Sequence, residues 1–135
     1  MSERPRRNPL PVAVAVVPVD EGGVVMIRRA IAPVGLAFPG GYIELGETWQ
    51  EALARELVEE TGVRVDPGAV RELRVLSAPD GTLLVFGSAP AVPRSALAGF
   101  AASDEVSELV VVDAPRDDVV FPLHGEVLAE HLAQR

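Results

Sequence analysis

The sequence contains no cysteine. Disulfide bonds, thiolate metal sites and catalysis by a cysteine nucleophile are therefore excluded. Basic residues are also scarce, since 12 Lys and Arg stand against 20 Asp and Glu, which gives a formal net charge of −8. This acidic balance argues against a broad, sequence-independent grip on nucleic acid. We expect no nucleic-acid partner, and a phosphate-bearing partner would need local arginines or a metal ion.

The sequence also lacks an apolar run long enough to cross a membrane. Its basic start and the apolar stretch after it imitate a secretory signal. That stretch is only about ten residues long, whereas a spanning helix needs roughly twenty. It contains Pro11 and Pro18 and is dominated by valine, which suits a strand better than a signal helix. Export is therefore the weaker interpretation, and we expect no membrane partner and a cytoplasmic location.

Length and composition predict one folded domain. A chain of 135 residues that is 48% hydrophobic is long enough to bury its own core. Residues 1–11 contain three prolines and no apolar period, so they are predicted to form a flexible tail. Residues 12–135 are predicted to form a single domain, because no internal repeat or second domain is visible.

The first half of the chain predicts two strands before a glycine-rich break. Residues 12–17 are unbroken apolar, which is typical of a central strand covered on both faces. Residues 20–23 have turn chemistry, and residues 24–29 read as a second strand, so the two strands are predicted to form a hairpin. Residues 39–41, Pro-Gly-Gly, are predicted to end regular structure and to let the backbone approach a ligand closely.

The second half predicts further strands and a final helix. Residues 70–77 and 83–87 read as strands joined by a Pro-Asp-Gly turn. Residues 90–100 are predicted to be a loop with one short helical turn, and residues 106–112 another strand. Apolar residues spaced for a one-sided helix fall within residues 123–134.

The stretch from residue 41 to residue 63 is unusually acidic. Its single base, Arg55, stands among six carboxylates. Thr48 and Glu51 fit a capping box, and Gly62 falls where a left-handed cap ends a helix, so a helix of about thirteen residues is predicted. The six acids are Glu44, Glu47, Glu51, Glu56, Glu59 and Glu60.

Helical spacing gathers three of these acids on one face. Glu56 and Glu60 are neighbours at i, i+4, and Glu59 lies within the same arc of roughly 100°. Like charges at this spacing repel, and a hard divalent cation such as Mg²⁺ or Mn²⁺ would remove the repulsion. The alternative is a merely solvated acidic face, which leaves Glu47 at the helix entrance and the neighbouring Arg55 unexplained.

The same stretch resembles the Nudix box of the Nudix hydrolases at every defining position. Gly41 is followed after five residues by Glu47 and, after seven more, by RELVEETGV at residues 55–63. The resemblance extends in strand order over residues 12–135. It implies an α/β fold of the Nudix type, an α/β/α sandwich with a mixed β-sheet.

The resemblance also implies a reaction and its partners. The family hydrolyses the pyrophosphate bond of a nucleoside diphosphate linked to another moiety, with Mg²⁺ or alternatively Mn²⁺. The expected partner is thus a small nucleotide, such as an ADP-ribose-like compound, a nucleotide sugar or a nucleoside triphosphate. Dimers are common in the family, so a homodimer is one expected state. Catalytically silent Nudix-fold sensors form the competing class, and an acidic interaction protein a third.

Site residues follow from the motif positions. Arg55 would orient the carboxylates, and the general base would be a box glutamate or a late acid, Asp104, Glu105 or Glu108. The residues expected to contact substrate are Arg28, Arg29, Gly40 and Phe38. The alternatives are that the two arginines are solvated edge charges and that Phe38 is a core residue. The implied catalytic set is Arg55, Glu56, Glu59, Glu105 and Glu108, and the implied metal set is Gly41, Glu47, Glu56, Glu59 and Glu60.

Three other residue types have a plainer interpretation. Trp49 precedes Leu53 by one helical turn, so packing is favoured over stacking on a base. Pro79 is similar in position to a proline of ADP-ribose-directed family members, but a hairpin turn also explains it. His124 and His131 are expected to be solvated or capping residues.

Overall fold

The computed structural model describes residues 7–134. Most of the predicted tail lies outside these residues, and β1 begins at Leu10, where Leu10 and Pro11 pair with Thr82 and Leu83. The predicted tail is therefore too long at its C-terminal end. The elements in chain order are β1 (Leu10–Val16), β2 (Val24–Arg29), β3 (Gly35–Ala37), β4 (Gly40–Tyr42), α1 (Trp49–Thr61), η1 (Pro67–Ala69), β5 (Arg71–Ser77), β6 (Thr82–Ser88), η2 (Arg94–Leu97), β7 (Val106–Val112) and α2 (Pro122–Ala133).

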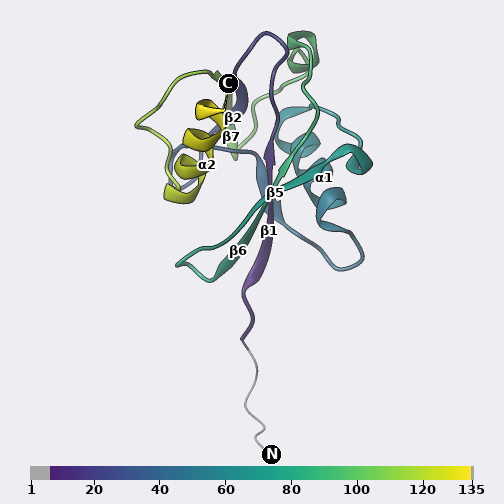
Figure 1. Ribbon diagram of the computed structural model, residues 1–135, viewed down its shortest axis with the longest axis vertical. Helices are drawn as coiled ribbons and strands as arrows, with labels where there is room; N and C mark the ends of the chain where they lie inside the picture. Colours follow the sequence, from purple (N-terminus) through teal and green to yellow (C-terminus); the bar gives the residue numbers. More distant parts are fainter. Residues whose placement is uncertain (1–6, 135) are drawn as a thin grey trace, which may run out of the picture.

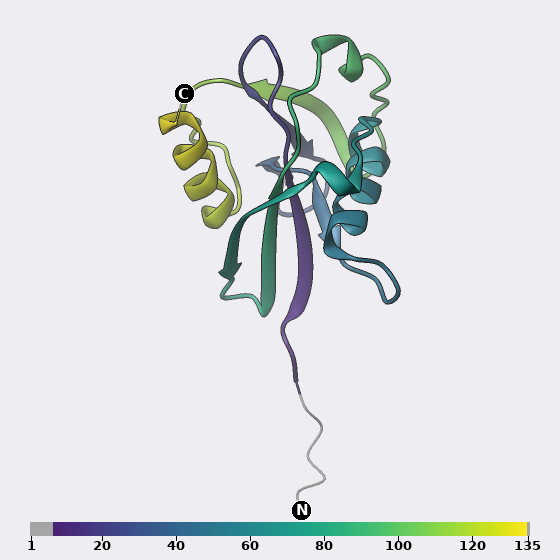
Figure 2. The same cartoon turned by 45° about the vertical axis from the view of Figure 1, so that its right-hand side comes forward.

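Two sheets lie between the two helices, as Figures 1 and 2 show. One is mixed, with strand order β4-β1-β6-β5 and a parallel β1–β6 pair, and the other is antiparallel, with order β3-β2-β7. Side chains alternate along β1, so Ala13 and Ala15 join the core under α1 while Val14 and Val16 join the core under α2. The predicted α/β/α sandwich with a mixed sheet is confirmed.

The predicted hairpin between the first two strands forms only next to its turn. There Pro18 and Val24 make an isolated antiparallel bridge, the Val19 amide donates to the Gly23 carbonyl and the Val25 amide to the Val17 carbonyl, each at 2.9 Å. However, β1 pairs with β4 on one edge and with β6 on the other, so it has no free edge left for β2. The chain therefore crosses from one sheet to the other at this turn.

The predicted break in regular structure is confined to the start of the Pro-Gly-Gly segment, since Pro39 lies in a bend between β3 and β4 and the two glycines belong to a strand. Residues Gly40–Tyr42 make β4, which pairs antiparallel with β1. A Cβ atom on Gly40 would collide with the Ala13 carbonyl oxygen. Glycine at this position therefore lets the two backbones approach closely, and the segment is a paired strand beside the acidic helix.

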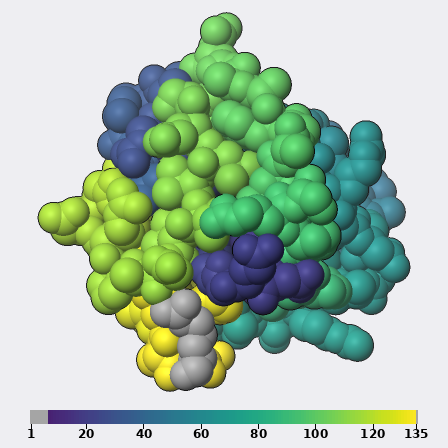
Figure 3. All heavy atoms as spheres, turned by 90° about the horizontal axis from the view of Figure 1, so that it is seen from above, coloured from purple at the N-terminus to yellow at the C-terminus, as the bar shows by residue number. Residues whose placement is uncertain are grey.

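The remaining predicted elements agree closely with the structure. The β5–β6 hairpin, the short helical turn η2, strand β7 and helix α2 all form where the sequence places them. Seen from above, β7 and the chain after it lie at the surface beside the green η2 segment (Figure 3). Within the described residues, no helix has the length and apolar character needed to span a bilayer.

Candidate functional site

Helix α1 is capped at both ends by the residues from which the sequence predicts it. The Thr48 hydroxyl accepts from the Glu51 amide at 3.1 Å, and the Glu51 carboxylate accepts from the Thr48 amide at 2.8 Å. Gly62 closes the helix with φ at 78°, donating to the Val58 carbonyl. The predicted capping box and glycine cap are confirmed, and they fix where the helix begins and ends.

The buried face of α1 turns two of its carboxylates toward β4. Leu53 and Leu57 are fully buried under the sheet. Glu60 then lies beside the strand, where its Oε1 accepts from the Gly40 amide at 2.7 Å. Glu56 lies beside Gly41, whose missing side chain leaves room for it, because a Cβ there would be 2.5 Å from the Glu56 Oε1.

Arg55 gathers the other acids of this region. Its guanidinium donates to both oxygens of Glu47, from NH2 at 2.7 Å and from Nε at 3.0 Å, a bidentate pairing. It also donates to Glu56 at 2.8 Å and to the Tyr42 carbonyl at 3.0 Å. Glu59 is 56% exposed, and its contact with the guanidinium is longer, at 3.4 Å. It is therefore the most loosely held of these acids.

The carboxylates of the site differ in the direction in which their surroundings shift the pKa. Burial, with the nearby Glu56 and Glu105, raises the pKa of Glu60 to about 8, against the opposing Gly40 hydrogen bond. Burial also raises the pKa of Glu56, although Arg55 acts in the other direction. The Arg55 hydrogen bonds instead hold the pKa of Glu47 below its usual range. Glu56 and Glu60 are therefore carboxylates whose charge the protein alone compensates poorly.

The two late glutamates in the implied catalytic set have different surroundings. Glu105 raises the pKa of both Glu56 and Glu60, so its charge acts on the box carboxylates. Its loop is fastened to the end of β2, where the Ala30 amide donates to the Glu105 carbonyl at 2.8 Å. Glu108 pairs with Arg28 at 3.0 Å instead, on the strand beyond the loop.

The residues expected to contact substrate are only partly gathered here. Gly40 lies in the site through its bond to Glu60. Arg28 is engaged by Glu108 and by Asp118, and Arg29 donates to the Ala32 and Pro33 carbonyls while its guanidinium lies over a phenylalanine ring. Arg29 nevertheless lowers the pKa of Glu60, so its positive charge reaches the site.

Phe38 corrects one expectation about the substrate contacts. It is only 2% exposed and packs edge to face with Phe86 in the core under α2. A ring enclosed in this way presents no face to a ligand, so Phe38 is a core residue. Trp49, by contrast, packs against the core under α1, as its helical spacing predicts.

The expectation of a solvated or capping His124 is wrong. His124 is buried, and its Nδ1 accepts from the Phe38 amide at 3.1 Å. Burial and the charge of Arg29 lower the pKa of His124 to about 4, so the ring is neutral near pH 7. Its sequence signal is its place one helical turn before Val127 and Leu128, on the buried face of α2.

The implied metal ligands are not gathered into one group. Among residues 7–134, no three His, Asp or Glu side chains converge closely enough to hold a metal ion. Arg55 holds the Glu47 carboxylate in a bidentate contact, while Glu56 and Glu60 are both desolvated and the charge of Glu56 helps to raise the pKa of Glu60. Two carboxylates in this state suit a hard divalent cation that prefers oxygen ligands.

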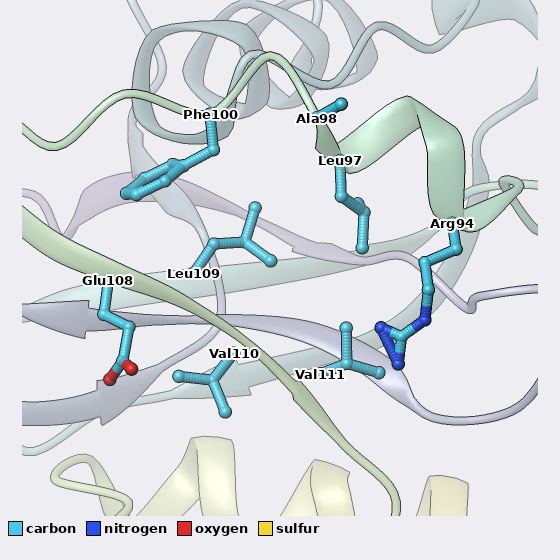
Figure 4. A pocket seen from close by; sticks show the side chains of 8 residues that line it. All are labelled: Arg94, Leu97, Ala98, Phe100, Glu108, Leu109, Val110 and Val111. Carbon is cyan, nitrogen blue, oxygen red and sulfur yellow. The ribbon is translucent and has the colours of Figure 1, made fainter.

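An open cleft of about 590 Å³ lies elsewhere, between the chain around η2 and strand β7 (Figure 4). Leu97 and Phe100 come from the η2 side, and Leu109 and Val111 from β7. Of the predicted site residues, only Glu108 lines this cleft, at the end away from Arg94. The cleft is therefore distinct from the pair Glu56 and Glu60.

Fold and site together define an α/β/α sandwich that packs a carboxylate-rich, arginine-clamped helix against a glycine-rich strand. The NUDIX domain profile matches residues 9–126, most of the chain. The chain therefore belongs to the NUDIX domain family.

Similar proteins place the chain within this family. The chain is 30% identical over 106 residues to the NAD-capped RNA hydrolase NudC of Haemophilus influenzae, covering 76% of this chain and 34% of that protein. It is 42% identical over 59 residues to the ADP-ribose pyrophosphatase of Methanocaldococcus jannaschii, covering 42% of this chain and 34% of that one. A solved NUDIX hydrolase from Nitrosomonas europaea superposes with a TM-score of 0.81 at 27% identity, covering 97% of this chain and 74% of that chain. The chain thus spans about a third of the length of the curated relatives it matches.

Proposed function

We propose that this protein is a metal-dependent hydrolase that cleaves the pyrophosphate bond of a nucleoside diphosphate linked to another moiety. The observation that carries the proposal is the pair Glu56 and Glu60, desolvated carboxylates with raised pKa beside Gly40 and Gly41. Buried carboxylates are costly, and carboxylates with a pKa shifted by burial cluster at functional sites. A bound cation that also contacts substrate phosphates would compensate the charge of these carboxylates, whereas packing alone does not explain why they are buried.

Each side chain has a defined part in the proposed reaction. The cation would be held by Glu56 and Glu60, with Glu47, Glu59 and the main chain at Gly41 as the other implied ligands, and when bound it supplies charge neutralisation at phosphate oxygens and an acidified water. Arg55 fixes the carboxylate of Glu56 through its bond at 2.8 Å. Gly40 fixes that of Glu60 by its amide.

We propose Glu105 as the group that takes the proton from the attacking water. It acts electrostatically on both Glu56 and Glu60, whereas Glu108 is engaged by Arg28. A base needs a free carboxylate near the reacting atoms, and Glu105 satisfies this better than Glu108. Arg29 contributes positive charge on the same side, which favours an anionic substrate.

The substrate class we propose is an adenine dinucleotide-like or ADP-ribose-like diphosphate. The similar proteins act on NAD-capped RNA and on ADP-ribose, as their names state. A net charge of −8 disfavours a long RNA partner, so we favour the small nucleotide. A cytoplasmic location, a homodimer and a single domain over residues 12–135 stay predictions.

A substrate panel tests the proposed function. The purified chain is incubated with Mg²⁺ or Mn²⁺ and with ADP-ribose, NADH, dinucleoside polyphosphates, nucleotide sugars, oxidised nucleoside triphosphates and a short NAD-capped RNA. We expect turnover of at least one diphosphate compound into two phosphorylated products, and its loss when EDTA removes the cation. Binding without turnover of any compound would instead favour the silent sensor.

Replacing Gly41 by alanine is expected to lower kcat without unfolding the protein. The new Cβ would lie 2.5 Å from the Glu56 Oε1 and 2.6 Å from its Oε2, so the carboxylate has to move. That end of the side chain is flexible, which keeps the loss of stability small. A displacement of about 1 Å at a reacting centre can cost about a hundredfold in rate.

The matched control for this substitution is Gly99→Ala. A Cβ at Gly99 meets nothing within 4 Å. Steady-state kinetics and thermal unfolding of both variants separate the effects. Equal kcat values for Gly41→Ala and Gly99→Ala would contradict the proposed role of Glu56 in the reaction.

A further inference from the structure

The chain between β3 and β4 is fastened to all three layers of the sandwich. The Phe38 amide donates to His124 in α2 at 3.1 Å, and the Pro39 carbonyl accepts from the Ala15 amide of β1 at 2.8 Å. The Gly40 amide then donates to Glu60 in α1 at 2.7 Å. Three consecutive residues thus connect α2, the mixed sheet and α1.

His124 is built into this connection by its surroundings. Its ring centroid lies 5.8 Å from that of Phe38, 5.5 Å from that of Phe86 and 5.0 Å from that of Phe121. Three aromatic rings fix the plane of the imidazole, so the direction of its Nδ1 lone pair is fixed as well. Because the ring is buried and neutral, this nitrogen is available as an acceptor for the Phe38 amide.

A leucine or phenylalanine would fill the same space on the buried face of α2. Either would leave the Phe38 amide without an acceptor in the core, and a buried unpaired amide costs about 1–3 kcal/mol. The amide would then turn toward another acceptor or toward water. Since Gly40 is two residues away in the same short segment, its own amide would turn with it.

We propose that His124 is a positioning residue for the carboxylate site, acting from the opposite helix layer by holding the Phe38–Gly40 backbone so that the Gly40 amide points at Glu60. This inference rests on the proposed function for its catalytic consequence. The geometric part concerns the fold alone and is measured without substrate. His124 contacts neither the carboxylates nor the reacting atoms.

The test compares His124→Asn with His124→Leu. The two side chains have the same number of heavy atoms and the same branching at Cγ, and both lack the ring. Only asparagine has an oxygen that can replace the imidazole Nδ1 as an acceptor. In ¹H–¹⁵N NMR spectra, we expect the Gly40 amide proton to move upfield in His124→Leu, because its hydrogen bond to a carboxylate weakens. We expect it to stay near its original position in His124→Asn.

Kinetics supply the second readout. We expect kcat to fall about tenfold or more in His124→Leu with KM little changed, and to be largely rescued in His124→Asn, since groups that orient metal-site ligands contribute about 10–100-fold. If His124→Leu does not fold, His124→Phe keeps the ring packing and still lacks the acceptor. An unmoved Gly40 resonance in the variant without an acceptor, or equal behaviour of the two variants, overturns the proposal. A parent protein that hydrolyses nothing refutes the proposed function but leaves the NMR comparison decisive for His124.

Discussion

Replacing Glu60 by glutamine is expected to abolish turnover and, at the same time, to stabilise the metal-free protein. Glutamine keeps an oxygen that can accept from the Gly40 amide, so the local hydrogen bond at 2.7 Å survives. It removes the negative charge that would hold a cation. Loss of several kcal/mol of charge stabilisation in the transition state corresponds to a fall in kcat of about a thousandfold.

The gain in stability follows from the raised pKa of Glu60. A carboxyl group whose folded-state pKa is above its unfolded value stabilises the fold most when protonated, and this contribution is lost as pH rises through the folded pKa. For Glu60 the window runs from the ordinary value of 4.5 up to about 8. At about 1.4 kcal/mol for each pH unit, the ionised group costs the fold a few kcal/mol at pH 8.

Denaturant unfolding at pH 5 and pH 8 in EDTA measures this effect. The parent is expected to lose free energy of unfolding relative to Glu60→Gln as the pH rises. Added Mg²⁺ at pH 8 is expected to stabilise the parent and not the variant, because only the parent binds it tightly in the folded state. Glu72→Gln, which removes the same charge from an exposed position on β5, serves as the control. Turnover within tenfold of the parent, or identical pH dependence in both proteins, would refute the role of Glu60.

The acidic helix could be predicted from the sequence because its signals are local. The capping box, the glycine cap and the i, i+4 spacing are each defined by residues within about one helical turn, and the structure reproduces both caps and the helix between them. The pairing of Arg55 with Glu56 could likewise be expected from adjacency. The bidentate Arg55–Glu47 contact joins residues eight positions apart and depends on how the loop before the helix folds back.

Features set by distant pairing could not be read in the same way. The first two strands have hairpin chemistry between them, but β4, at residues 40–42, occupies the edge of β1 that a longer hairpin would need. Phe38 and His124 are 86 residues apart, and only the sandwich brings them together. The sequence contained a clue for His124 in its helical spacing, yet its acceptor role depends on a backbone amide that no side-chain pattern records.

Replacing Arg55 by alanine is expected to weaken both the fold and the site. It would leave Glu47 and Glu56 without the guanidinium that pairs with them, and the Tyr42 carbonyl without its hydrogen-bond donor. Removing one partner of a buried ion pair costs about 3–5 kcal/mol. Arg55 is 27% exposed, so solvent screening reduces the expected loss to about 2–3 kcal/mol.

The loss should depend on pH in a direction opposite to that of Glu60→Gln. Arg55 holds the pKa of Glu47 below its usual value. A group with a depressed folded-state pKa stabilises the fold above its unfolded pKa, and this contribution is lost as pH falls through the folded value. The difference in free energy of unfolding between the parent and Arg55→Ala is therefore expected to be largest near neutral pH and to shrink below about pH 4.

Arg55→Lys and Arg94→Ala complete the experiment. Lysine keeps the charge but cannot donate two parallel hydrogen bonds to Glu47, so it should recover only part of the stability and leave kcat about tenfold low. Arg94 is 59% exposed and 4.0 Å from Glu21, so its removal should cost less than about 0.5 kcal/mol. Full rescue by lysine would mean that charge alone suffices, and equal losses in Arg55→Ala and Arg94→Ala would mean that the clamp contributes nothing. The expected ranking, with Arg55→Ala lowest in both stability and kcat, requires that one guanidinium both supports the fold and sets the direction of the Glu56 carboxylate.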